Sequence, residues 1–144
     1  MSPFQLPFAE DVNYWQSGKS PPDAWIDRTK ALVKGLGGVI LMDAFGSDAS
    51  GRAAFAMQLE IGGERYKVIW PVLPSRTKNE RAARIQAATM LYHDVKQRCL
   101  SAVVLGARAA FFSYLVLPDG RTAAEVATPE LADSLPALLR AKNE

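Results

Sequence analysis

The sequence predicts an α+β fold: an N-terminal helix, a three-stranded antiparallel sheet, a long helix packed on the sheet, and a short C-terminal helical segment. Three patterns predict it. Between residues 52 and 70, apolar and polar residues alternate on both sides of Gly62-Gly63, as in a hairpin with one buried face. The segment Lys78 to Leu117 contains no proline and is amphipathic in its first half. Ser20 to Asp23 carries residues that start helices.

A chain of 144 residues with 49% hydrophobic and 22% charged residues is long enough for one domain with its own core, and this composition excludes wholesale disorder. The net charge of +2 is too small to demand a polyanionic partner, so a nucleic-acid surface would have to come from local clustering of cations. We expect a single domain over residues 20–144, preceded by an arm over residues 1–19.

The arm carries aromatic residues among prolines and polar residues, so we expect an extended segment that packs through its rings or reaches another molecule. The candidate partner contacts are Phe4, Phe8, Tyr14 and Trp15.

The first helix is predicted to start at Ser20, whose hydroxyl can accept a hydrogen bond from the third amide, with Pro21 at a position that needs no amide proton. It runs to about Lys34, and the glycines that follow end it.

Three strands follow in the prediction. Val39 to Phe45 is the first, and a polar loop over residues 46–51 leads to the second, Arg52 to Glu60. Gly62-Gly63 closes a hairpin because both residues can take positive φ angles, and Glu64 to Trp70 returns as the third strand.

The long helix has an apolar stripe at alternating steps of three and four residues, which we expect to face the core. The stripe consists of Ile85, Ala88, Tyr92, Val95, Cys99 and Ala102. The opposite, polar face is expected to consist of Gln86, His93, Asp94, Gln97 and Ser101. The side chains expected to be largely buried are Trp25, Phe55, Leu59, Val68, Ile85, Tyr92, Val95 and Cys99.

From Leu100 onward apolar residues surround the helix axis, leaving no polar face except near Arg108. Such a stretch has to be covered. Either the domain wraps it, with Gly106 marking a kink or a break, or another subunit or partner buries it, with Phe111 and Phe112 as candidate contacts. A membrane span is rejected, because the stretch is barely long enough and a central arginine would cost about 3 kcal/mol.

The start of the long helix is basic, although a helix N-terminus favours negative charge. Unpaired amides and converging cations together form an anion site, and nucleic acid is a common polyanionic partner. The alternative is a solvated, exposed helix end. The candidate nucleic-acid contacts are Arg76, Lys78, Arg81 and Arg84, extended by Arg65 and Lys67 on the solvent face of the sheet.

After the long helix we expect an extended segment at Tyr114 to Leu117, a turn at Pro118-Asp119-Gly120, and a short helix around Ala123 to Ala127. A last amphipathic turn or two is expected from Leu131, Leu135, Leu138 and Leu139.

No enzymatic activity, cofactor or metal site is expected. One cysteine and one histidine are too few for a usual zinc site, and helical spacing separates Cys99 from His93. Ser47 lacks the motif of a nucleophile elbow. The acidic residues near the sheet are expected to be solvated: Asp43, Asp48, Glu60 and Glu64. The rings of Trp15, Trp25 and Trp70 could stack on nucleic-acid bases, but burial in the protein is the more frequent role of such rings.

Several of these elements resemble an uncharacterised family of small bacteriophage and prophage proteins. The residues that carry the resemblance are Ser20-x-x-Asp23, Gly62-Gly63-Glu64-Arg65-Tyr66 to Pro71-x-Leu73-Pro74, Val95-Lys96-Gln97-Arg98, and Leu115-Val116-Leu117-Pro118-Asp119-Gly120-Arg121-Thr122. Between Arg98 and Phe111 this sequence is less charged than the family. The resemblance implies a phage or prophage origin and brings no activity or site to transfer. Because the start of the chain also shows no secretory pattern, we expect a location in the cytoplasm of a bacterial host.

The order helix, three antiparallel strands, helix is similar to that of double-stranded-RNA-binding domains, and Arg81 to Ala88 is similar to the basic, alanine-rich start of their second helix. Those domains use that helix end on phosphates.

The sequence therefore leads to two expectations. The first is a phage-encoded, non-enzymatic nucleic-acid-binding accessory protein that contacts phosphates through the basic helix start. The second is an interaction module that binds and modulates a host protein, such as a defence or replication factor, or that self-assembles.

Overall fold

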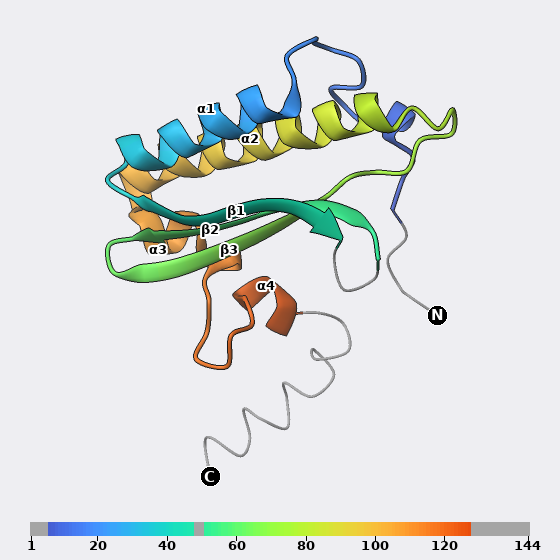
Figure 1. Ribbon diagram of the computed structural model, residues 1–144. Helices are drawn as coiled ribbons and strands as arrows, with labels where there is room; N and C mark the ends of the chain where they lie inside the picture. Colours follow the sequence, from blue (N-terminus) through green and yellow to red (C-terminus); the bar gives the residue numbers. More distant parts are fainter. Residues whose placement is uncertain (1–5, 48–50, 128–144) are drawn as a thin grey trace.

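The computed structural model describes residues 6–47 and 51–127, and it confirms the α+β fold class (Figure 1). Two helices, α1 (Pro22–Gly35) and α2 (Glu80–Leu105), cover one face of a three-stranded sheet. The short helix α4 (Ala123–Val126) lies on the opposite side of the sheet (Figure 1).

The sheet has the order β1-β2-β3, formed by β1 (Val39–Ser47), β2 (Ala53–Ile61) and β3 (Glu64–Pro71), and both pairs of neighbours are antiparallel. Gly62 and Gly63 have φ angles of 59° and 82° and form the predicted turn between β2 and β3. The register of β1 with β2 shifts between Ile40 and Met42, which is a β-bulge.

The helix α1 starts one residue later than predicted with Ser20 as its N-cap. Pro21 is its N-cap and Pro22 its first residue, and no side chain accepts a capping hydrogen bond. The fixed φ of the two prolines starts the helix without the expected contribution from Ser20. The helix ends where Gly37 takes a φ of 88°.

The long helix α2 ends at Gly106, which has a φ of 89° and therefore a backbone conformation that interrupts the helix. A four-residue helix, α3 (Ala107–Ala110), and a 3₁₀ turn, η2 (Phe112–Tyr114), follow. The break brings Phe111 back onto the sheet, where it is fully buried with its ring centroid 5.6 Å from that of Tyr66. The domain thus wraps only part of the stretch from Leu100 onward.

The buried face of α2 differs from the predicted stripe. Val95, Cys99, Ala88 and Ala102 are buried as expected, but Ile85 and Tyr92 are only half-buried. Gln86, placed on the polar face by periodicity, is fully buried. The reason is that α2 is covered on a second side by the N-terminal segment, so its buried surface is wider than one helix–sheet contact requires. The buried residues of α2 are Ala83, Gln86, Ala87, Ala88, Thr89, Leu91, Val95, Cys99 and Ala102.

The main core lies between the helices and the sheet, and Phe55, Leu59 and Val68 are buried in it as predicted. Trp25, which was expected to be largely buried, is only half-buried and packs against this core. A second, smaller cluster of Ala9, Leu73 and Ala83 joins the N-terminal segment to the start of α2.

After η2 the chain runs as predicted into an extended stretch, a turn and a short helix. Leu115 bridges to Tyr66, and Val116 bridges to Thr122 across the turn. The Thr122 side chain caps α4 by accepting from the amide of Glu125 at 3.2 Å. The leucines expected to form a last amphipathic turn lie outside the described residues. Within the described chain, no helix has the length and apolar character needed to cross a membrane.

Candidate interaction surfaces

The predicted basic cluster lies at the start of α2 and in the loop before it. Arg76, Lys78, Arg81 and Arg84 are all exposed, and Lys78 has a φ of 56°. Asn79 caps the helix, with its side-chain oxygen 3.2 Å from the amide of Ala82. The cap satisfies one of the unpaired amides that were expected to attract an anion.

Two of these cations are already engaged. The guanidinium of Arg76 forms a double hydrogen bond with the carboxylate of Asp11, one branch being 3.0 Å from Nη1 to Oδ1, and it lies 4.7 Å from the Phe8 ring centroid. Arg84 lies 4.8 Å from the ring centroid of Phe45. Because Glu10, Asp11 and Glu80 lie at the same end of the molecule, the local excess of positive charge is smaller than the sequence suggested.

Arg65 and Lys67 do not join this cluster. They lie near the start of β3 on the sheet face away from the helices. Side chains alternate between the two faces of a strand, and the neighbouring Tyr66 and Val68 are buried on the helix side. Arg65 donates to Gln58 at 3.1 Å, and Lys67 lies 3.9 Å from Glu125. The strand separates them from the start of α2 by most of its length (Figure 1).

The N-terminal segment packs on α2 as an ordered strap and not simply as an extended arm. Its Ala9–Asp11 stretch is a 3₁₀ turn, η1, and Ala9 is fully buried. The amide nitrogen of Gln86 donates to the carbonyls of Ala9, Val12 and Asn13 at 2.8, 3.1 and 3.0 Å. These bonds explain why a polar residue of α2 is buried.

The four aromatic residues predicted as partner contacts have different roles. Tyr14 stacks on His93, with ring centroids 4.7 Å apart and an interplanar angle of 7°. Trp15 is half-buried against the second cluster, and Phe8 is exposed beneath Arg76. Phe4 lies outside the described residues.

Glu10 holds the strap to the loop before α2. Its carboxylate accepts from the Ser75 hydroxyl at 2.8 Å, the Thr77 hydroxyl at 2.9 Å, and the amides of Arg76 and Thr77 at 3.0 and 3.2 Å. Desolvation alone would raise the pKa of Glu10, but these hydrogen bonds outweigh it and lower the pKa from 4.5 to about 2.

The lowered pKa of Glu10 predicts a loss of stability in acid. A carboxyl whose pKa is lower in the folded state stabilises the fold above its ordinary pKa, and this contribution is lost as pH falls from 4.5 towards about 2. We expect the thermal midpoint of Glu10→Gln to be lower than that of the wild type at pH 7, with the difference shrinking across that window. Glu60→Gln, on β2, is the control, and an unchanged difference between pH 7 and pH 2 would contradict the assignment.

A network that the sequence did not reveal ties the chain after Gly106 to α2. The Tyr114 hydroxyl donates to Asp94 Oδ2 at 2.5 Å, and Arg98 Nε donates to the same oxygen at 2.9 Å. Arg98 also donates to the carbonyl of Ala110 at 3.1 Å. Burial and the hydrogen bond to Asp94 raise the pKa of Tyr114, so the hydroxyl stays protonated as the donor.

The last turns of α2 carry the large apolar side chains with the highest exposed fractions in the described chain, and the exposed Phe112 of η2 follows them. We call this set the apolar end: Leu100, Val103, Val104, Leu105 and Phe112. The four residues on α2 are between 63% and 79% exposed, and Phe112 is 54% exposed. Since Phe111 is buried, only Phe112 of the two predicted phenylalanines is available to a partner.

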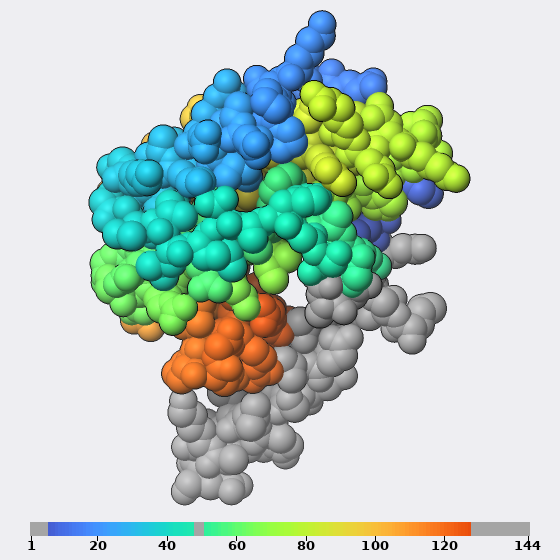
Figure 2. Space-filling view, in the orientation of Figure 1, coloured from blue at the N-terminus to red at the C-terminus, as the bar shows by residue number. Residues whose placement is uncertain are grey.

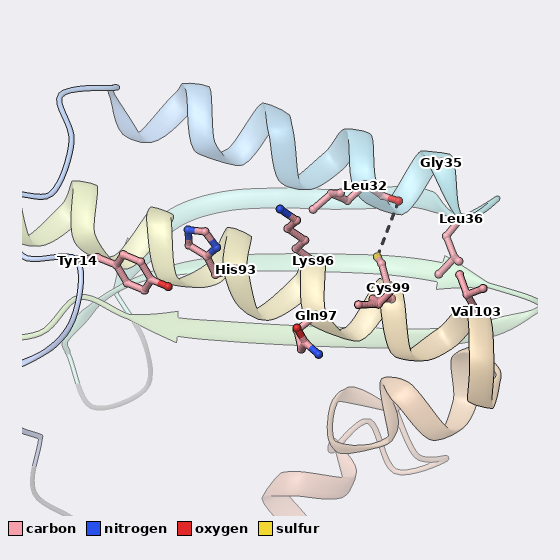
Figure 3. Close-up of a pocket in the computed structure, with 10 residues that line it drawn as sticks. Tyr14, Leu32, Gly35, Leu36, His93, Lys96, Gln97, Cys99 and Val103 are labelled. Carbon is pink, nitrogen blue, oxygen red and sulfur yellow. Dashed lines mark hydrogen bonds between the residues drawn. The ribbon is translucent and has the colours of Figure 1, made fainter.

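A groove of about 710 Å³ runs between α1 and α2 up to the apolar end (Figure 3). Its apolar walls come from Leu32, Leu36, Leu100 and Val103, and no acidic residue lines it. Lys96 and His93 line it on the α2 side.

Cys99 also lines this groove but is not a nucleophile candidate. Its Sγ lies 3.8 Å from the carbonyl oxygen of Leu32, and burial raises the pKa of the thiol (Figure 3). It packs as a core residue, as predicted.

Among the described residues, no three His, Cys, Asp or Glu side chains lie close enough together to hold a metal ion. Asp43 pairs with Lys30 at 2.8 Å, and Glu64 lies 3.8 Å from Arg108. Asp48 lies outside the described residues.

Comparison with protein-family models, with curated proteins and with solved structures finds no match.

Proposed function

We propose that the protein is a non-enzymatic binding module that docks a partner protein through the apolar end and the adjoining groove. One observation carries this proposal: large apolar side chains more than half exposed around the last turns of one helix. Fully burying such a side chain is worth about 1.5–3 kcal/mol. Contiguous apolar surface of this kind marks interaction sites in proteins that otherwise bury their cores well.

The groove favours a particular kind of partner. An amphipathic helix laid in a groove between two helices places its apolar residues at the floor and its polar residues at the rim. Here the floor is apolar, and the charged residue of the lining is Lys96, with no acidic residue beside it. The occupant is therefore an amphipathic helix of the partner that carries a carboxylate to meet Lys96.

The basic start of α2 supports nucleic-acid binding less strongly. Arg76 is paired with Asp11, and Asn79 occupies part of the helix N-terminus. Among the described residues of the cluster, Lys78, Arg81 and Arg84 form no ion pair, and the Arg84 guanidinium lies over the Phe45 ring. Two or three phosphate contacts give weak affinity with a shallow dependence on salt, because few counterions are released.

The test is capture of partners on immobilised protein from a nuclease-treated bacterial lysate, because the phage resemblance points to a bacterial host. The variants are Val103→Glu in the apolar end, Arg81→Ala/Arg84→Ala in the basic start, and Ala124→Glu on α4 as the control. A glutamate in a desolvated contact costs at least about 2 kcal/mol, roughly a thirtyfold loss of affinity.

We expect one stoichiometric protein that is held by the wild type, by the control and by the arginine variant but is lost by Val103→Glu. Retention of that protein by Val103→Glu contradicts the proposal. If nucleic acid is captured from untreated lysate instead and only the arginine variant releases it, the protein is a nucleic-acid-binding protein and the apolar end is not its functional surface.

A further inference from the structure

The two edges of the sheet differ. The β3 edge is covered near its start, because the amide of Val116 donates to the carbonyl of Arg65 at 2.9 Å and Leu115 bridges to Tyr66. Charged Arg65 and Lys67 lie on the same strand. Covering and charging an edge strand are the usual ways of preventing further strand pairing.

Among the described residues, nothing covers the β1 edge and no unpaired charge protects it. In the described chain β1 pairs only with β2, and eight of its nine residues are exposed. Figure 2 shows the strand uncovered beside α1 as a band across the face of the molecule. Its large apolar side chains are between 40% and 56% exposed: Val39, Leu41, Met42 and Phe45. After the bulge, residues 42–47 keep a regular register with β2 and present an open row of backbone groups.

The single charge of β1 does not protect the edge, because Asp43 is paired with Lys30 of α1 at 2.8 Å. No lysine, arginine or proline occurs in the strand. The backbone groups of this edge are therefore available to a further strand.

A charged stripe of α1 lies beside this edge. Asp23, Asp27, Lys30 and Lys34 follow at steps of four, three and four residues and so share one helix face. Lys30 and Lys34 line one surface hollow together with Val39 and its neighbours in β1. Asp23 lines a second hollow together with Phe45 of the same strand. The half of the stripe nearest the helix start is acidic, and the other half is basic.

The charges of this stripe are complementary to those of a second α1 stripe that runs in the opposite direction. About a two-fold axis perpendicular to the helix, the two copies of α1 run antiparallel, so the acidic half of each faces the basic half of the other. A parallel contact would place like charges together. The net charge of +2 adds little repulsion between copies.

We propose that β1 pairs with β1 of a second copy of the chain, antiparallel and about a two-fold axis, joining two three-stranded sheets into one of six strands. Asp23 of each copy then faces Lys34 of the other, while Lys30 stays paired with Asp27 and Asp43 of its own chain. This dimer uses the strand edge and leaves the apolar end free for a different partner.

The test is the solution mass by sedimentation over a range of protein concentrations at low salt. The expected species has twice the 15.7 kDa chain mass. Ala44→Lys places a cation on an exposed residue in the middle of the edge. It should weaken dimerisation by up to about fivefold, the effect of a cross-strand contact worth about 1 kcal/mol. Ala124→Lys, an equal change on exposed α4, should leave the dimer unchanged.

A charge exchange identifies the α1 contact. Asp23→Lys and Lys34→Asp should each weaken the dimer by about threefold to tenfold, as loss of surface ion pairs does, and the double variant should restore it. Within one chain these residues are about 16 Å apart along the helix, so only a contact between copies produces the rescue.

A monomer at every concentration, a dimer unaffected by Ala44→Lys, or no rescue by the double variant overturns the proposal. If the chain is a dimer that Val103→Glu abolishes and Ala44→Lys leaves intact, self-association occurs through the apolar end and not through β1. A peptide or other protein seated on β1, with the chain itself monomeric, would likewise replace the second copy as the occupant.

Discussion

Replacing Gln86 by alanine is expected to lower the free energy of unfolding by about 3 kcal/mol and to release the N-terminal strap from α2. The Gln86 amide is fully buried, and its Nε2 lies 2.8–3.1 Å from three backbone carbonyl oxygens. The group has two protons, so one of them is shared between two acceptors. Without it, buried carbonyls of the strap lose their donor and a small cavity remains.

The measurement is urea unfolding together with backbone hydrogen exchange of residues 8–15. Gln97→Ala is the matched control, because Gln97 lies on the same helix and is exposed. We expect the variant to lose protection in the strap before the sheet opens. Unchanged exchange in the strap, or equal destabilisation by the control, would show that Gln86 does not hold it.

Replacing Asp94 by alanine is expected to destabilise the fold by about 2–3 kcal/mol. The carboxylate accepts from both Tyr114 and Arg98, and its loss leaves a half-buried guanidinium and a hydroxyl without their partner. Asp94 and Arg98 are 23% and 26% exposed, so solvent screening keeps the cost below that of a fully buried pair.

A double-mutant cycle of Asp94→Ala with Tyr114→Phe measures this contact. We expect the two changes to be non-additive by about 1 kcal/mol or more, because each removes the same charge-assisted hydrogen bond. Additive effects would contradict the network. Since these bonds hold the chain after Gly106 against α2, the cycle also shows what positions Phe112 beside the other residues of the apolar end.

The sheet and the two helices were predictable because their signals are local. Gly62-Gly63 specifies its own turn, and the alternation around it specifies which face of β2 is buried. The start of the short helix α4 follows in the same way from the turn before it and from Thr122 as its cap.

The residues that sequence reasoning misplaced depend on contacts between distant parts of the chain. Periodicity treats Gln86 as polar, whereas its burial depends on the carbonyls of a strap more than 70 positions away. Phe111 and Phe112 are equivalent in the sequence, and only the break at Gly106 turns one inward and leaves the other exposed. The engagement of Arg76 likewise depends on Asp11, which no local pattern connects to it.

Photo-crosslinking from position 103 tests most directly the claim that the apolar end binds a partner protein. A photoreactive amino acid replaces Val103, which is 75% exposed, and a matched protein carries it at Ala124 on α4. On irradiation in a bacterial lysate, we predict one covalent adduct from position 103 with a protein other than the chain itself, and none from position 124. No adduct from position 103, the same adducts from both positions, or an adduct with a second copy of the chain would contradict the account.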